Sequence, residues 1–286
     1  KFNFLAMGRK LLADPNLPNK LLNNEQDKIK PCQYSYECVS RIFLNGQMVC
    51  ASDVGLGKKD KNYSKKRLII IGAGPAGLEL SLQAAKRNIN VSIYEKQEFI
   101  GGNLIGASLI YEPYKKLLNY YKASVENKLI DLHLNKEIAV DDIEKEFPDC
   151  QNIVIASGGV PSSTIPNAIN VQSWLNPFIE NNHGEIDSIK LDLKKEKYGN
   201  CAILGTDTIQ LHLASFLCSI GVNVSLVRNN QTIGSSMPVV LRWKILDELV
   251  NQVPIISEEE YLLTKFDLTI DATFESKTNL KKLEAI

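Results

Sequence analysis

The stretch from Leu68 to Glu95 reads LIIIGAGPAGLELSLQAAKRNINVSIYE, and it decides the fold of this chain of 286 residues. It opens with an uninterrupted apolar run at residues 68–71, which is typical of a strand buried on both faces of a parallel sheet. Apolar residues at helical spacing behind Pro75 then predict a helix over residues 75–88. Residues 90–94 predict a second strand, so the stretch is a βαβ unit.

The turn of this unit matches the pattern G-x-G-x-x-G in the context that the pattern requires, after an apolar strand and at the start of a helix. The first glycine allows the tight turn, the second lets a pyrophosphate approach the backbone, and the third lets helix and strand pack closely. The helix N-terminus favours an anion, and the carboxylate at the end of the second strand can accept hydrogen bonds from ribose hydroxyls. The predicted dinucleotide-binding residues are Gly72, Ala73, Gly74, Pro75, Ala76, Gly77 and Glu95.

Strands and helices continue to alternate beyond this unit. We expect helices over 114–125 and 140–147, strands over 130–134 and 153–156, a second strand-helix-strand block over 201–228, and strands over 2–7 and 266–273. This alternation predicts an α/β protein with parallel sheets and two Rossmann-like domains.

Composition excludes some classes of partner. The 33 basic residues balance the 33 acidic ones, so no overall field steers the chain toward nucleic acid or an anionic membrane. It has neither an apolar run long enough to span a bilayer nor the zones of a signal peptide, so we expect a cytoplasmic protein without a membrane partner. Because the chain opens on Lys1 rather than Met, we expect the true N-terminus to lie upstream.

Three motifs recur in the order of a known class of protein: GAGPAGLE at 72–79, Glu95 followed by Lys96, and the pair Gly101-Gly102. In this respect the chain resembles the glutathione reductase-like flavoproteins with two dinucleotide-binding domains. The resemblance implies that the first unit binds FAD, with Lys96, Gly101 and Gly102 near it. It also implies that Ala156-Ser157-Gly158 lies near the flavin, so Ala156 and Gly158 join the expected cofactor-binding residues.

The N-terminal segment narrows this resemblance. Met7-Gly8-Arg9, Ala13-Asp14-Pro15, Pro31-Cys32 and Cys50 resemble the end of the barrel in the family of trimethylamine dehydrogenase, 2,4-dienoyl-CoA reductase and enoate reductase. Those enzymes join an FMN-binding (β/α)8 barrel, an iron-sulfur cluster and two nucleotide domains. The resemblance implies that Gly8 and Arg9 contact the FMN phosphate and that Cys32, Cys38 and Cys50 ligate the cluster.

The same resemblance implies a domain order. We expect the end of the FMN-binding barrel at 1–30, a cysteine loop and linker at 31–66, the first part of the FAD-binding domain at 67–165, a second NAD(P)-binding-like domain at 166–255, and a return to the FAD-binding domain at 256–286.

The cysteine loop departs from the family at one position. The pattern C-x2-C-x2-C-x11-C would place a fourth thiolate at position 35, where this chain has Ser35. A serine hydroxyl deprotonates far less readily than a thiol, so a three-iron or serine-ligated cluster, a zinc site and free cysteines all stay open.

The second glycine motif departs further. It keeps Gly205 but has Asp207 and Gln210 where the other two glycines belong. A carboxylate about 5 Å from a diphosphate costs on the order of 3 kcal/mol per phosphate charge at an effective dielectric constant of about 20. Arg228, at the end of the next strand, would favour a 2'-phosphate but does not cancel Asp207. We expect a weakened NAD(P)H site.

The sequence therefore predicts a flavin-dependent oxidoreductase in which NAD(P)H reduces FAD and electrons pass through an iron-sulfur cluster to FMN, where an activated alkene such as an enoate or enoyl-CoA is reduced. We name no catalytic residue, because the barrel that would hold the substrate is absent from this chain. Two alternatives stay open: a non-catalytic FAD- or ADP-binding remnant, and an electron-transfer flavoprotein that takes electrons from a donor protein.

Overall fold

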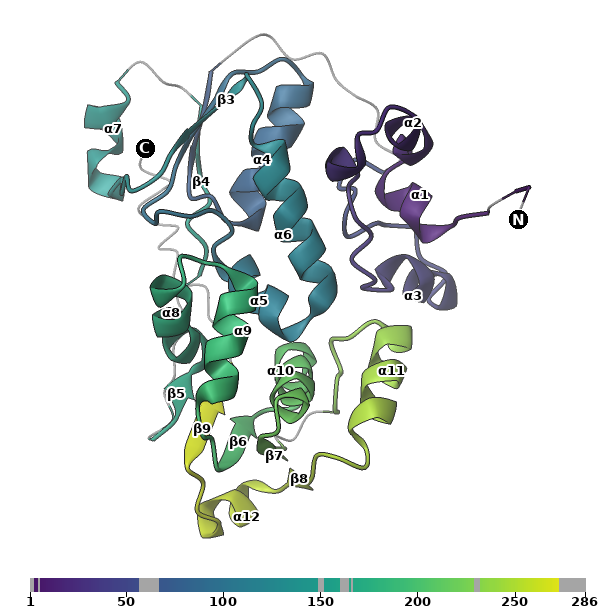
Figure 1. The fold of residues 1–286 in the computed structure, drawn as a ribbon, viewed down its shortest axis with the longest axis vertical. Helices are drawn as coiled ribbons and strands as arrows, with labels where there is room; N and C mark the ends of the chain where they lie inside the picture. The colour runs from purple at the N-terminus through teal and green to yellow at the C-terminus, as the bar shows by residue number, and fades with distance from the viewer. Residues whose placement is uncertain are drawn as a thin grey trace. The chain divides into compact units, whose positions relative to one another are not determined.

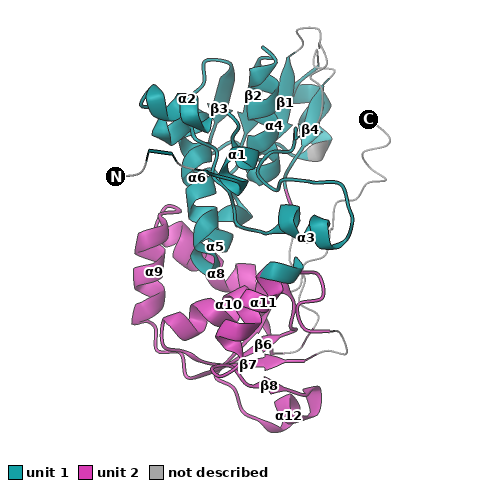
Figure 2. Cartoon of the chain, turned by 90° about the vertical axis from the view of Figure 1, so that its right-hand side faces the viewer, with its two compact units in different colours: residues 1–157, 238–240 teal, residues 158–237, 241–286 magenta. Residues whose placement is uncertain are grey.

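The computed structural model describes residues 3–4, 6–56, 67–148, 152–159, 165, 167–228 and 232–272. The chain divides into two compact units (Figure 2). The first comprises residues 1–157 and 238–240, and the second comprises residues 158–237 and 241–286. Each is described by itself below.

A four-stranded parallel sheet forms the centre of the first unit. Its strand order is β3-β2-β1-β4, with β1 at Leu68–Ile71, β2 at Val91–Tyr94, β3 at Ile130–His133 and β4 at Ile153–Ile155. Helices α4 (Pro75–Lys86), α5 (Asn103–Ile110) and α6 (Glu112–Ser124) connect its strands, and η2 (Val140–Asp142) and α7 (Ile143–Glu146) follow β3 (Figure 1). Ile69 and Ile71 pack with Ile138 and Ile143 in a core on one face. The predicted βαβ unit is confirmed.

The N-terminal segment of the first unit consists of short helices. These are α1 (Arg9–Ala13), α2 (Leu17–Leu22), η1 (Gln26–Lys28) and α3 (Glu37–Phe43). The predicted strand over 2–7 is wrong for the residues described there, because none of them pairs with another strand and Phe4 is 94% exposed. A strand outside a sheet leaves its backbone groups without partners.

A buried ion pair ties this segment to the dinucleotide fold. Lys30 Nζ lies 2.6 Å from both carboxylate oxygens of Glu79 on α4, and the two side chains are 7% and 13% exposed. Tyr121 on α6 donates a hydrogen bond of 3.1 Å to the same carboxylate. The cysteine loop therefore begins from a point fixed on the first unit's helices.

The second unit repeats the design with a five-stranded parallel sheet. Its order is β5-β9-β6-β7-β8, with β5 at Ile169–Asn170, β6 at Asn200–Leu204, β7 at Asn223–Val227, β8 at Ile255–Ile256 and β9 at Leu268–Asp271. Its helices are α8 (Val171–Asn181), α9 (Ile186–Lys195), α10 (Thr208–Ser219), α11 (Val239–Leu249) and α12 (Glu258–Leu263). The predicted α/β class with two Rossmann-like parallel sheets is confirmed.

One predicted domain boundary needs correction. We expected residues 256–286 to return to the first domain, but β9 lies between β5 and β6 in the second sheet. Ile270 is fully buried there, and Asp267 accepts a hydrogen bond from Asn200 N at the start of β6. Residues 256–272 therefore complete the second sheet, while Phe274 and the end of the expected return segment lie outside the described residues.

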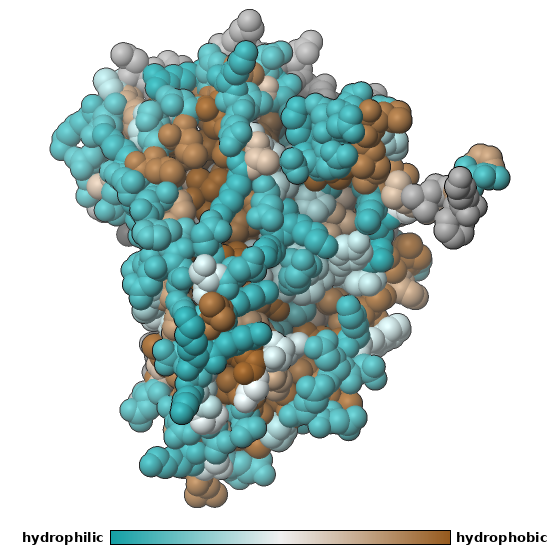
Figure 3. All heavy atoms as spheres, in the orientation of Figure 1, coloured by the Kyte–Doolittle hydropathy of each residue, from teal (hydrophilic) through white to brown (hydrophobic). Residues whose placement is uncertain are grey.

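The surface carries both apolar and hydrophilic side chains. Apolar side chains lie in groups among hydrophilic ones on the face drawn in Figure 3. Within the residues that the structure describes, no helix combines the length and apolar character needed to cross a membrane.

Candidate functional site

The first glycine turn, between β1 and α4, has no room for a side chain at two of its positions. Gly72 has φ +107°, and a Cβ there would lie 2.5 Å from the carbonyl oxygen of Ala156 on the neighbouring strand. A Cβ at Gly77 would lie 2.1 Å from the carbonyl oxygen of Gly72. The turn is therefore packed tightly on its inner side.

The same turn is open on its outer side. A Cβ built on Gly74 would meet no atom within 4 Å, so the backbone is bare at the N-cap of α4. Pro75 and Ala76 are exposed on the first turn of this helix. An open approach to a helix N-terminus is the geometry that a pyrophosphate requires, because unpaired N–H groups and the helix dipole favour an anion there.

Glu95 at the end of β2 holds the turn in place. Its Oε2 accepts a hydrogen bond from Ala73 N at 2.8 Å, and its Oε1 accepts one from Gln97 N at 2.9 Å. Glu95 as a whole is only 9% exposed. A carboxylate has about four lone-pair sites, so two remain for the ribose hydroxyls of a bound adenosine.

A second loop closes over the turn. Gly101 N donates a hydrogen bond of 2.8 Å to Ala73 O, and Gly101 has φ +118°. A Cβ on Gly102 would lie 3.3 Å from the Cα of Gly74, so this pair of glycines lies against the bare backbone. The structure thus brings Gly101, Gly102 and Glu95 together around the first glycine turn.

Two of the remaining predicted contacts, Ala156 and Lys96, lie at the same edge of this sheet, whereas Gly158 belongs to the second unit. Ala156 follows β4 and donates a hydrogen bond of 2.7 Å from its N to Ile71 O. Gly158 is exposed, with φ +77°, and a Cβ there would meet nothing within 4 Å. Lys96 is exposed directly after Glu95. Ligands of open parallel sheets bind at this carboxyl edge.

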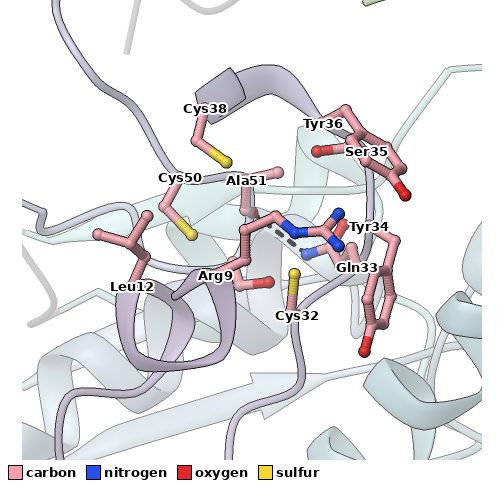
Figure 4. A pocket seen from close by; sticks show the side chains of 11 residues that line it. Arg9, Leu12, Cys32, Gln33, Tyr34, Ser35, Tyr36, Cys38, Cys50 and Ala51 are labelled. Atoms are coloured by element: carbon pink, nitrogen blue, oxygen red, sulfur yellow. Dashed lines mark hydrogen bonds between the residues drawn. The ribbon is translucent and has the colours of Figure 1, made fainter. Parts of the chain in front are cut away.

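The three N-terminal cysteines lie in one pocket, separate from the glycine turn. In Figure 4 the thiols of Cys32, Cys38 and Cys50 lie around the pocket, and the Arg9 side chain extends across it. Burial raises the pKa of the Cys38 thiol, and the neighbouring Cys32 and Cys50 raise it further. This pocket favours a protonated Cys38 rather than a reactive thiolate.

Ser35 occupies the fourth ligand position of the pocket, but its hydroxyl makes a hydrogen bond with the backbone. Its Oγ accepts a long hydrogen bond of 3.5 Å from Glu37 N at the start of α3. Among the described residues, no group of three or more His, Cys, Asp or Glu side chains is arranged to hold a metal ion. Because Ser35 offers a hydroxyl where a fourth thiolate would be needed, the pocket supplies three thiols and does not fit a four-thiolate cluster.

Arg9 is held by aromatic rings at this pocket. Its guanidinium carbon lies 4.4 Å from the ring centroid of Tyr36 and 5.0 Å from that of Tyr34. Its Nη1 is buried and has no hydrogen-bond partner in the described part of the chain. A Cβ on the preceding Gly8 would meet nothing within 4 Å. A guanidinium nitrogen without a partner can donate to an anion such as a phosphate, which is the part that the resemblance gives to Arg9.

The second glycine turn follows β6. Gly205 has φ +96°, and Arg228 is exposed after β7, as the sequence predicts. Ser236 was not among the predicted residues, although its N donates a hydrogen bond of 3.2 Å to Asp207 Oδ1. The internal repeat of the sequence could have indicated the loop that contains Ser236, because Gly234 occupies the position in the second unit that Gly101 occupies in the first.

Two parallel sheets, each with a glycine turn between a strand and a helix, define a protein of the dinucleotide-binding oxidoreductase class. The chain belongs to the pyridine nucleotide-disulphide oxidoreductase family, whose sequence model matches residues 66–261.

Individual relatives agree with the N-terminal resemblance. The chain is 31% identical to cinnamate reductase of Clostridium sporogenes over 183 residues, which are 60% of this chain and 27% of that protein. It is 24% identical to a probable N-methylproline demethylase of Rhizobium meliloti over 289 residues, covering 96% of this chain and 38% of that protein. These relatives support the predicted membership of the enoate reductase and trimethylamine dehydrogenase group.

A solved structure has the same fold. A 2-naphthoyl-CoA reductase superposes with a TM-score of 0.76 at 23% identity, covering 96% of this chain and 44% of that one. The chain thus spans 27% to 44% of the length of these three proteins.

Proposed function

We propose that this chain is the FAD-binding part of a flavin-dependent oxidoreductase whose whole protein reduces an activated alkene. The open backbone at Gly74, closed on its inner side by Gly72 and Gly77, is the observation that carries the proposal. A structural turn would need no bare approach to the helix N-terminus, whereas a pyrophosphate needs one.

Each residue of the turn has a defined part in holding the cofactor. The backbone N–H groups at the start of α4 would hold the pyrophosphate, and the two free lone-pair sites of Glu95 would accept the ribose hydroxyls. When bound, FAD supplies electron-transfer chemistry that no side chain of this chain can supply.

The substrate class is proposed from the relatives. Cinnamate reductase and a multifunctional alkene reductase/demethylase of Caballeronia cordobensis are both among them. Their names point to a carbon-carbon double bond, and conjugation to a carbonyl group is what makes such a bond accept a hydride. The residues that would position the alkene belong to a barrel that this chain does not contain, so we assign no catalytic residue.

FMN enters the proposal through Arg9. The unsatisfied Nη1 of Arg9 would donate to the FMN phosphate held at the end of the barrel. The iron-sulfur cluster has no part in the proposal, because three thiols and a serine hydroxyl are not the four thiolates that hold such a cluster in its usual form. NAD(P)H is the electron donor that membership of the family suggests.

The experiment is to identify the nucleotide that the chain retains. The purified chain is incubated with FAD, ADP and FMN in equal amounts, passed through gel filtration, denatured, and its released nucleotides are separated chromatographically. We expect about one FAD per chain, with little ADP or FMN. Retention of ADP alone would favour the non-catalytic reading, and retention of no nucleotide would overturn the proposal.

A further inference from the structure

The second unit repeats the backbone of the first glycine turn. Gly205 N donates to Val227 O at 2.9 Å, as Gly72 N donates to Tyr94 O at 2.8 Å. Helix α10 starts at Thr208 in the same register as α4 starts at Pro75. The two turns can therefore be compared position by position, and any difference in ligand binding comes from their side chains.

The first difference is at the position that must stay bare. Asp207 is the N-cap of α10, where Gly74 is the N-cap of α4. Asp207 Oδ1 accepts a hydrogen bond of 3.2 Å from Ser236 N. Its carboxylate is thus held at the helix N-terminus, which is the place that the pyrophosphate takes in a dinucleotide site.

The second difference lies in the loop that closes over each turn, which in the second unit makes additional contacts through Ser236. Gly234 N donates to Thr206 O at 2.7 Å, just as Gly101 N donates to Ala73 O in the first unit. The hydroxyls of Thr208 and Ser236 also lie 3.1 Å apart, a contact for which the first turn has no counterpart because Pro75 has no hydroxyl. Ser236 therefore ties the loop to Asp207 and to the first residue of α10.

The third difference fills the inner side of the turn. Gln210 stands where Gly77 stands in the first unit, and it is 7% exposed. A Cβ on Gly205 would lie 3.2 Å from Gln210 Nε2 and 3.4 Å from its Cδ. The side chain of Gln210 thus packs against the turn, at the position where a dinucleotide site has a third glycine and no side chain.

We infer that the second unit takes no NAD(P)H, because the carboxylate of Asp207 occupies the place of the pyrophosphate. Within the described residues Asp207 forms no ion pair that would neutralise it. Two negative charges about 5 Å apart weaken binding by more than about a hundredfold per phosphate charge. Electrons would then reach the FAD of the proposed function from a donor other than a pyridine nucleotide.

The test is calorimetric titration of the purified chain with NADH and with NADPH. We expect no saturable binding of either nucleotide up to about 1 mM, a limit of about 4 kcal/mol in affinity. Asp207→Gly removes the carboxylate and bares the backbone, so this variant should gain binding with a Kd at least about a hundredfold lower. Asp207→Asn keeps an acceptor for Ser236 N but removes the charge, and should gain about tenfold.

Two results would overturn the inference. One is saturable binding of either nucleotide to the wild-type chain with a Kd below about 1 mM. The other is an Asp207→Gly variant with native circular dichroism that binds no better than wild type. FAD retention, measured on the same samples, separates this test from that of the proposed function, because Asp207 lies in the other unit and its replacement should leave FAD binding unchanged.

Discussion

Gly74 and Gly77 lie three residues apart, yet replacing them should change the free energy of unfolding in different ways. Gly77→Ala places a Cβ against the carbonyl oxygen of Gly72, so we expect it to cost about 1–3 kcal/mol of the free energy of unfolding. Gly74 has φ −75° and open surroundings, so Gly74→Ala should leave that free energy unchanged or raise it by about 0.4–1 kcal/mol. Urea unfolding without nucleotide measures both. Equal destabilisation by the two variants would contradict the described turn.

Glu95 should act on stability before any cofactor binds. Glu95→Ala leaves the buried Ala73 N–H without its acceptor, which costs about 1–3 kcal/mol. Glu95→Gln is the matched control, because its amide oxygen can still accept from Ala73 N, and it should cost less. The measurement is again urea unfolding of the apo chain, and an unaltered midpoint for Glu95→Ala would show that the carboxylate does not hold the turn.

At this scale the sequence predicts what is local and misses what is distant. The glycine pattern and Glu95 could be read from one short stretch, because each residue's conformational requirement is set by its neighbours. The bond from Ser236 N to Asp207 could not, because it joins residues 29 positions apart. The sequence shows that Asp207 stands where the motif has a glycine, and only the fold shows that Ser236 N holds its carboxylate there.

Among the elements, α4 and the N-terminal segment depend on the Lys30–Glu79 ion pair. Lys30→Met should cost about 3–5 kcal/mol of the free energy of unfolding, because it leaves the Glu79 carboxylate buried and unpaired. The double replacement with Glu79→Leu should recover most of that loss. Lys28→Met is the control, since the Lys28–Glu25 pair is 65% and 35% exposed and should contribute less than about 1 kcal/mol. A cost for Lys30→Met no larger than this control would contradict the burial of the pair.

Helix α10 should lose stability in mild acid through His212. Burial lowers the pKa of His212 from 6.5 to about 4, while Glu248 raises it and Lys244 lowers it. Between these pH values the unfolded chain binds more protons than the folded one, so stability falls as the pH falls from 6.5 to about 4. The slope should approach about 1.4 kcal/mol per pH unit. Urea unfolding across this range should show a smaller slope for His212→Gln, and identical slopes would remove His212 as the cause.

Element positions were predicted better than element partners. The strand over 130–134 and the helix over 114–125 agree with β3 and α6 to within two residues at each end, because apolar periodicity marks an element wherever it packs. The same periodicity does not say which sheet a strand joins. The domain of β9 was expected from the family resemblance, and that expectation was wrong. Periodicity also suggested a strand near Phe4 that has no partner among the described residues.

At the scale of the whole molecule, the chain is two versions of one fold with different turns. The turn of the first unit is bare where a phosphate would lie, and that of the second is closed by its own carboxylate. The repeat explains why the sequence predicts both sheets, whereas the side chains decide which of them binds a dinucleotide. Both units have the fold of the family, and the side chains at their glycine turns give the two units different proposed roles.

Whether FAD lies at the bare backbone of Gly74 is tested most directly by equilibrium binding of FAD to the wild-type chain and to Gly74→Asp, which copies the Asp207 carboxylate into the first turn. We expect wild type to bind about one FAD, and Gly74→Asp, with native circular dichroism, to bind it at least about a hundredfold more weakly. Equal affinity in the two proteins would contradict the claim that FAD is held at the bare backbone of Gly74.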